Sequence, residues 1–257
     1  MIRRKDGTDW LLIAQPDHAA VCGQFAERWG SPDGNFGPVD PGGPVAVAAR
    51  EHDNGWAEWE AAPTVDPGAA RPRHFTEMPA AEFLGIWQRG VRRGADRDPH
   101  VGLLVSMHAG RLTRARLASP RDPPADRDPL RQFLQEQEAA QDVVRSRLGL
   151  DPQAVAAHSW LIATWDRLSL LLCCGPVPAA TLAEVPARGR TRDIAVRPTG
   201  ERSASLDPYP FAGGPVELAV PARRIPALPY TAPEALRAAL GAAPVERLTF
   251  ALHPVWH

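Results

Sequence analysis

Along the first 174 residues, apolar side chains recur at intervals of three, four and seven, which is the spacing of one helix face. The pattern predicts helices over 16–30, 45–53, 79–91, from Asp98-Pro99 to about 118, over 130–148 and over 152–174. The segments between them, 31–44, 61–75 and 119–129, are rich in proline and glycine and are expected to be loops. This part of the chain is therefore predicted to be a helical bundle.

From residue 175 onward, prolines recur every few residues and short β-type runs replace the helical pattern, at 193–197, 216–220 and 247–253. Residues 1–15 contain a polar DGTD turn and an apolar run, which predicts a hairpin or strand ending near Ala14. Since that run has no local partner, we expect it to pair with the carboxy-terminal strands. The predicted fold is mainly α, a single domain over 1–257 with a helical core at 16–174 and a small sheet from 1–15 and 190–257.

The composition narrows the possible partners. The 257 residues are 44% hydrophobic, and 29 basic against 30 acidic residues give a net charge of −1, so no global field attracts nucleic acid. A small-molecule substrate is expected. The longest apolar stretch, 168–174, is too short to cross a bilayer, and the start of the chain lacks the apolar run of a signal peptide. Three cysteines without CxxC spacing favour a reducing cytoplasm. The oligomeric state is left open.

Four of the predicted helices carry a metal-capable side chain on the apolar face. His18, His52, His108 and Asp166 each lie three, four or seven residues from apolar positions of their own helix. Asp53 directly follows His52. Burial of an ionised aspartate without a partner costs several kcal/mol, and a cation removes that cost. The five residues are therefore predicted to bind one or two divalent transition-metal ions, namely iron, manganese, zinc or nickel.

Simpler explanations exist for each residue taken alone. A single histidine on an apolar helix face is usually satisfied by a backbone carbonyl. Asp166 is followed by Arg167 and could belong to an ordinary ion pair. Glu58 and Glu60 could orient a ligand, act as a base, or form a solvated rim. The coincidence of four such positions on separate helices is what favours a metal centre.

With these residues identified, the chain resembles the HD superfamily of metal-dependent phosphohydrolases, whose signature is a His, an adjacent His-Asp pair and a distant Asp. His18, then His52-Asp53 in EHDNGW, then Asp166 in TWDRLSL follow that order. His108 would fill the additional histidine position of two-metal members. Among the histidines between Asp53 and Asp166, only His108 is a clear ligand candidate, so Glu136, Glu138 or His158 could supply a further ligand, or the site holds one ion. More closely, QPDHAA, EHDNGWAEWE, HFTEMP, LLVSMH and WDRLSLLLC resemble an uncharacterised bacterial family of unknown function.

The HD resemblance implies an HD-like helical core and hydrolysis of a phosphate ester of a nucleotide or other small metabolite. Asp53 would bridge metals or take a proton, and Arg111, three residues after His108, could bind phosphate oxygens. One alternative is a di-iron oxygenase, because some proteins resembling this superfamily use the same ligands to activate dioxygen. Another is a non-catalytic protein in which the metal is structural or a small ligand is bound.

Overall fold

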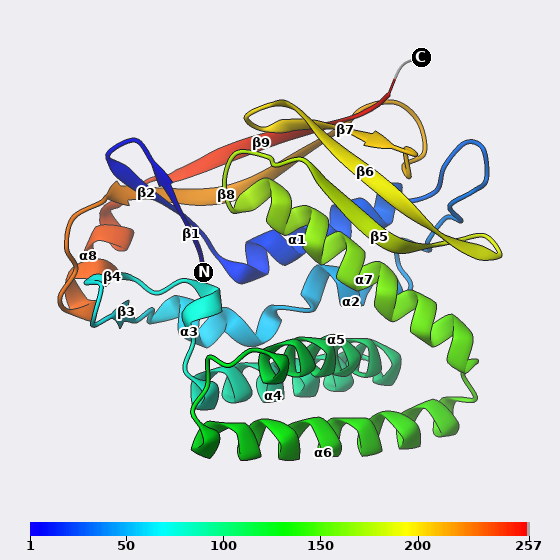
Figure 1. Cartoon of the computed structure of the whole chain (residues 1–257), viewed down its shortest axis with the longest axis horizontal. Helices are drawn as coiled ribbons and strands as arrows, with labels where there is room; N and C mark the ends of the chain where they lie inside the picture. Colours follow the sequence, from blue (N-terminus) through cyan, green and yellow to red (C-terminus); the bar gives the residue numbers. More distant parts are fainter. Residues whose placement is uncertain (256–257) are drawn as a thin grey trace.

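A computed structural model describes residues 1–255 and contains both a helical layer and an extensive sheet (Figure 1). In the described residues, helices account for 50% and strands for 24% of the structure. Seven of the strands form one curled sheet that resembles half a barrel. The prediction of a mainly α bundle with a small sheet is therefore wrong. The main helices are α1 (Gln15–Arg28), α2 (Pro44–Glu51), α4 (Ala80–Arg97), α5 (Pro99–Ala118), α6 (Pro124–Leu148), α7 (Pro152–Cys173) and α8 (Pro233–Ala242). Shorter ones are η1 (Asn54–Trp56), α3 (Ala57–Ala61) and η2 (Phe75–Glu77).

The large sheet joins both ends of the chain. Its strands are β1 (Ile2–Asp6), β2 (Asp9–Ile13), β5 (Ala180–Ala187), β6 (Arg190–Gly200), β7 (Ser203–Asp207), β8 (Val216–Pro226) and β9 (Val245–Pro254), in the order β1-β2-β8-β9-β7-β6-β5. Only the β7–β9 pair is parallel. The expected pairing of the first residues with the carboxy-terminal part is present, because β2 pairs with β8. A separate two-stranded ribbon consists of β3 (Val65–Asp66) and β4 (Arg71–Pro72).

The sheet is larger than expected because its strands contain residues that disguise the β pattern. β6 and β8 are 11 residues long, and each includes a proline, Pro198 and Pro221 respectively. Proline is tolerated where a ladder is incomplete. Pro198 adjoins an irregularity in the β6–β7 register, and β2 pairs only with residues 223–226 of β8, which leaves Pro221 with a neighbouring strand on one side. β7 is only five residues long, and β5 has a register irregularity between Leu182 and Val185 and a proline near its end, so neither shows a regular alternation.

The helix boundaries follow local capping chemistry. The Asp98 side chain accepts hydrogen bonds from the first backbone N–H groups of α5, and Asp151 does the same for α7, each followed by a proline in the first turn. These two starts agree with the prediction. α6 begins at Pro124 and includes Pro129, so the second half of the predicted loop 119–129 is helical.

Two apolar clusters place the helices. The first lies between the sheet and the nearest helices, α1 and α7, and includes Ile13, Phe25, Trp165, Val196 and Leu218. α2 packs on α1 and on α5, and α4 and α6 both pack on α5 farther from the sheet (Figure 1). The second cluster fills the end of the helical layer near η1 and includes Trp56, Met78, Phe83, Trp87 and Phe133. The interior between α1, α2, α5 and α7 is where the predicted metal ligands meet.

Gly55 allows η1 to lie directly against α4. A Cβ atom at this position would be 2.2 Å from the carbonyl oxygen of Ile86 and 2.6 Å from the backbone nitrogen of Gly90. We expect Gly55→Ala to lower the free energy of unfolding by about 1–3 kcal/mol, because backbone atoms cannot yield as a flexible side chain would. Urea denaturation measures this. Gly241→Ala in α8 is the control, since its added Cβ meets no atom within 4 Å; equal stability of the two variants would contradict the close packing.

Candidate metal centre

The backbone brings the predicted ligands together from four helices. His18 lies in the first turns of α1, His108 in the middle of α5 and Asp166 in α7. His52 is the C-cap of α2, and Asp53 leaves helical geometry with φ −99° and ψ 15° before η1 begins. This break after α2 lets two adjacent residues contribute to one cluster, which a continuous helix would separate by about 100°.

The ligand atoms form a compact group. The Nε2 atom of His18 is 3.2 Å from Oδ2 of Asp53 and 3.2 Å from Oδ1 of Asp166. Nε2 of His52 is 3.4 and 3.7 Å from the same two oxygens. Nε2 of His108 is 3.7 Å from the other oxygen of Asp166, Oδ2. All three histidines and Asp53 are at most 3% exposed, and the Asp166 side chain is 14% exposed.

These contacts fit an ion better than direct hydrogen bonds. In the described residues, the buried Nε2 atoms of His18 and His52 have no hydrogen-bond partner, although carboxylate oxygens are close. Ligands at about 2.1 Å from a tetrahedral ion are separated from one another by about 3.4 Å. The four distances between a histidine Nε2 and a carboxylate oxygen, 3.2 to 3.7 Å, lie around that value. The donor set of neutral imidazoles and carboxylates suits a divalent transition metal.

The imidazoles of His18 and His52 are each oriented by the other ring nitrogen. Nδ1 of His18 is 2.6 Å from Oγ of Ser169, and that hydroxyl donates to the His18 carbonyl at 3.2 Å. Nδ1 of His52 donates to the carbonyl of Ala49 at 2.9 Å. Both rings therefore present Nε2 to the cluster, as metal-ligating histidines usually do. Ser169 was missed by the sequence analysis, although its position three residues after Asp166 on the same helix face is a usable signal.

The imidazoles of the cluster compensate the negative charge of the two buried carboxylates, Asp53 and Asp166. Burial lowers the pKa of His18 and His52, but contacts with Asp166 and Asp53 outweigh it and raise both pKa values. Burial conversely raises the pKa of the two carboxyls, and the neighbouring histidines hold the pKa of each below its ordinary value. Burial and the charge of His52 lower the pKa of His108 to about 4. A divalent cation carries the same charge as the two imidazolium protons it would replace.

The residues form two overlapping groups of three potential ligands, His18–His52–Asp53 and His52–His108–Asp166. His52 belongs to both, but its Nδ1 is engaged by Ala49, so its single Nε2 lone pair can bind only one ion. The two oxygens of Asp166 face different histidines. That carboxylate is therefore the group able to bridge two ions if a second one binds beside His108.

Several other predicted candidates lie elsewhere. Glu136 accepts from Gln132, and Glu138 pairs with Arg114, both on the exposed side of α6. His158 lies beside His100, with 6.2 Å between ring centroids. None of the three belongs to a ligand group within residues 1–255.

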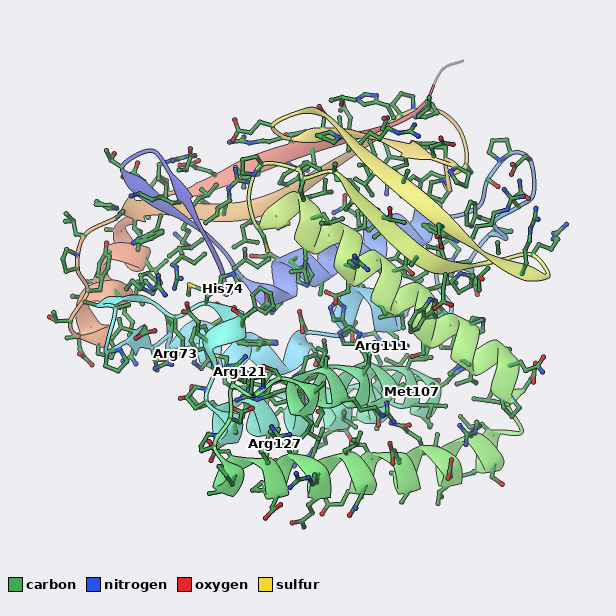
Figure 2. The ribbon with its side chains drawn as sticks, in the orientation of Figure 1. Arg73, His74, Met107, Arg111, Arg121 and Arg127 are labelled. Carbon is green, nitrogen blue, oxygen red and sulfur yellow. The ribbon has the colours of Figure 1, made fainter. Side chains whose placement is uncertain are left out.

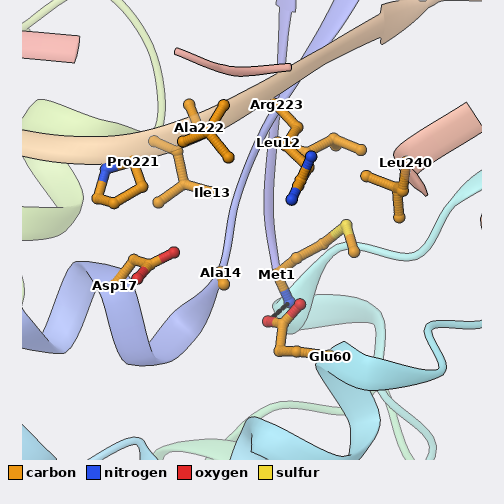
Figure 3. Close-up of a pocket in the computed structure, with 11 residues that line it drawn as sticks. Met1, Leu12, Ile13, Ala14, Asp17, Glu60, Pro221, Ala222, Arg223 and Leu240 are labelled. Atoms are coloured by element: carbon orange, nitrogen blue, oxygen red, sulfur yellow. Dashed lines mark ion pairs between the residues drawn. The ribbon is translucent and has the colours of Figure 1, made fainter. Parts of the chain in front are cut away.

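Glu60 has a structural partner. It forms an ion pair with the Met1 amino group at 2.8 Å and accepts a hydrogen bond from the backbone N–H of Gln15 at 3.0 Å. Figure 3 shows this pair at the edge of a cavity of about 220 Å³ that also borders Asp17 and Arg223. None of the predicted metal ligands lines that cavity. Glu60 thus fixes the start of α1, which positions His18, and is separate from the centre itself.

Arg111 does not border the cavity that is lined by Asp53, His108 and Asp166. Its guanidinium group stacks on the Trp160 ring at 4.0 Å, beside Met107, and it lines a separate cavity. Figure 2 shows Arg111 and Met107 toward one end of the helical layer and Arg121 toward the other. The suggestion that Arg111 binds phosphate oxygens therefore lacks geometric support, and Arg116 and Arg121 are the arginines that border the cavity at the centre.

That cavity, of about 300 Å³, gives access to the cluster. Asp53, His108 and Asp166 form one part of its lining, and apolar side chains form most of the rest: Trp56, Phe75, Phe83, Trp87, Leu112, Ala115 and Leu170. Gln15, Thr76, Ser119 and two arginines complete it. A concave, largely apolar cavity with a few convergent polar groups is the usual form of a small-molecule site.

Glu77 stabilises the η2 wall of this cavity. It accepts hydrogen bonds from Arg3, Arg71 and the backbone of His74. Burial raises the pKa of this carboxyl, but these donors outweigh burial and lower the pKa from 4.5 to about 2. The depressed pKa means that the ionised group stabilises the fold fully above pH 4.5, and that this contribution is lost as the pH falls toward 2.

Accordingly, we expect Glu77→Gln to lower the free energy of unfolding at neutral pH, because the amide cannot replace the charge of the carboxylate. The expected loss is only about 1–2 kcal/mol, because solvent screens this partly exposed group. The difference from the unmodified protein should narrow as the pH falls below 4.5. Urea denaturation between pH 3 and 7 measures it, with Glu234→Gln on exposed α8 as the control. A difference that stays constant across that range would show that Glu77 does not act through its charge.

Fold and site together define an α+β protein with a buried cluster of imidazoles and carboxylates that could hold a metal ion at the end of an apolar cavity. Residues 1–227 match the family described as "Protein of unknown function (DUF3891)", and the chain belongs to that family. This confirms the assignment to a family of unknown function. Comparison with curated proteins and with solved structures gave no match. Among residues 1–255, no helix is both long and apolar enough to cross a membrane.

Proposed function

We propose that the protein is a metal-dependent hydrolase of the HD type that acts on a phosphate ester of a small metabolite. The observation that carries the proposal is the contact between two imidazoles and two carboxylates: the Nε2 atoms of His18 and His52 each lie 3.2 to 3.7 Å from one oxygen of Asp53 and one oxygen of Asp166, beside an accessible cavity. Their order along the chain, with the adjacent His-Asp pair in second place, is that of the HD signature.

The residues would divide the chemistry as follows. His18, His52, Asp53 and Asp166 would hold one divalent ion, which when bound supplies positive charge for phosphoryl oxygens and lowers the pKa of a nearby water molecule. Asp53 borders the cavity and is the carboxylate proposed to accept the proton of the attacking water. His108, uncharged at neutral pH, would contact the substrate or a second ion beside Asp166. The apolar walls would exclude bulk water from the reacting groups.

A metal and substrate screen tests this proposal. Protein purified without chelator is analysed for its metals, then assayed with phosphate monoesters and diesters after addition of manganese, zinc, iron or nickel. We expect metal bound in at least stoichiometric amount and metal-dependent release of phosphate or alcohol from one class of ester. Bound metal without hydrolysis of any ester would refute the proposal, and a colour change of an iron form in air would then favour an oxygenase.

A further inference from the structure

The cavity above the metal centre has two chemically different ends connected by one face of α5. His108, Leu112, Ala115 and Arg116 all line it, at positions i, i+4, i+7 and i+8. Eight residues of helix correspond to about 12 Å along its axis. The cluster of predicted ligands therefore lies at one end of the cavity, and Arg116, Ser119 and Arg121 lie at the other.

The far end carries positive charge that is incompletely compensated. Arg116 and Asp122 form a buried pair with two hydrogen bonds of 2.7 and 2.6 Å, so this carboxylate is already engaged. Arg121 donates one bond to the Met78 carbonyl, and its Nε is 4.0 Å from the same Asp122. Two guanidinium groups thus share one carboxylate. The next carboxylate, Glu77, is bound by other arginines.

The middle of the cavity is apolar and wide enough for a ring. Trp56, Phe75, Phe83 and Trp87 contribute aromatic surface, and the small side chain of Ala115 leaves room along α5. In the described residues the indole nitrogens of Trp56 and Trp87 are buried and have no hydrogen-bond partner, and the rest of both rings is apolar. Aromatic or aliphatic ligand groups are stabilised by such walls, whereas a strongly hydrated sugar or polyol would lose hydrogen bonds to water.

We propose that the ligand is an elongated organic molecule with an anionic group at each end: a phosphate group at the metal end, an aromatic or apolar body, and a second anionic group held by Arg121. The phosphate part of this assignment rests on the proposed function, while the selection by Arg121 and the apolar walls is independent of hydrolysis. Arg121 is a binding residue that determines specificity, and Arg116 is a positioning residue fixed by Asp122.

Phosphonates test the assignment because they resemble phosphate esters but are not hydrolysed. Binding of phenylphosphonate and of 4-(2-carboxyethyl)phenylphosphonate to the metal-loaded protein is followed by tryptophan fluorescence, to which Trp56 and Trp87 contribute as cavity walls. We expect the carboxylated compound to bind at least about 10-fold more tightly, as one charge-assisted hydrogen bond would provide. Arg121→Gln should remove this preference.

Arg111→Gln is the matched control, because Arg111 lies on the same side of the sheet but in another cavity, against Trp160. It should keep the full preference for the carboxylated compound. Equal affinity of both phosphonates for the unmodified protein, or a preference that survives Arg121→Gln, would overturn the proposal. Failure of the proposed function has a different signature, since phosphate esters would then remain unhydrolysed while the Arg121-dependent preference persists.

Discussion

Replacement of His52 by alanine is expected to lower metal affinity by at least about 100-fold, because loss of a ligand should exceed the effect of losing an outer partner. His52 belongs to both potential ligand groups, and its Nε2 faces the two carboxylates at 3.4 and 3.7 Å. Its removal also leaves Asp53 and Asp166 buried with less positive charge around them. Metal content after dialysis and hydrolysis of the best ester should both fall to near background.

The control for this prediction is a partly buried histidine outside the cluster. His100→Ala removes an imidazole from α5 whose Nε2 also has no partner, but which lies beside His158 and borders a different cavity. This variant should keep its metal and its activity. Circular dichroism of both variants separates loss of ligand from loss of fold. Retention of stoichiometric metal by folded His52→Ala would show that the cluster is not a metal centre.

The convergence of the site residues could be predicted because burial and helical spacing supply independent constraints. His18, His108 and Asp166 each share a helix face with apolar residues, so the core that buries those faces must also bring the polar groups together. Asp53 could not be placed by periodicity, since it points inward only because α2 ends at His52. Its inclusion came from the adjacency of His and Asp in the HD signature.

Helical spacing could not predict the features that depend on packing between segments far apart in the sequence. The spacing of Arg111 from His108 is suitable for a shared face, but Trp160 from α7 captures the guanidinium group and directs it to another cavity. Arg121 lies in a loop, where no periodicity predicts direction. The sheet was underestimated for a similar reason: strand pairing between residues up to 217 positions apart, as for Asp9 and Pro226, is set by the partner strand, and prolines in β6 and β8 obscure the local pattern.

Ser169→Ala is expected to weaken metal binding by about 10- to 100-fold while leaving the fold intact. The Ser169 hydroxyl is the only group within hydrogen-bond distance of Nδ1 of His18 in the described part of the chain. It also donates to the carbonyl of the same residue, so it fixes both the ring and the backbone of α1 at this point. Without it, the imidazole can rotate or change tautomer, and Nε2 then no longer offers its lone pair to the ion that the cluster would hold.

Competition with a chromophoric chelator measures the metal affinity of Ser169→Ala. If Ser169 had a purely structural role, a folded Ser169→Ala variant would bind metal as tightly as the unmodified protein. Ser159→Ala is the matched control, because Ser159 is a buried serine of the same helix whose hydroxyl has no partner. Ser169→Thr retains a hydroxyl at the same position and should recover part of the affinity. If Ser169→Ala binds metal as tightly as Ser159→Ala, the ring of His18 is held by packing alone, and the orienting hydrogen bond has no part in the centre.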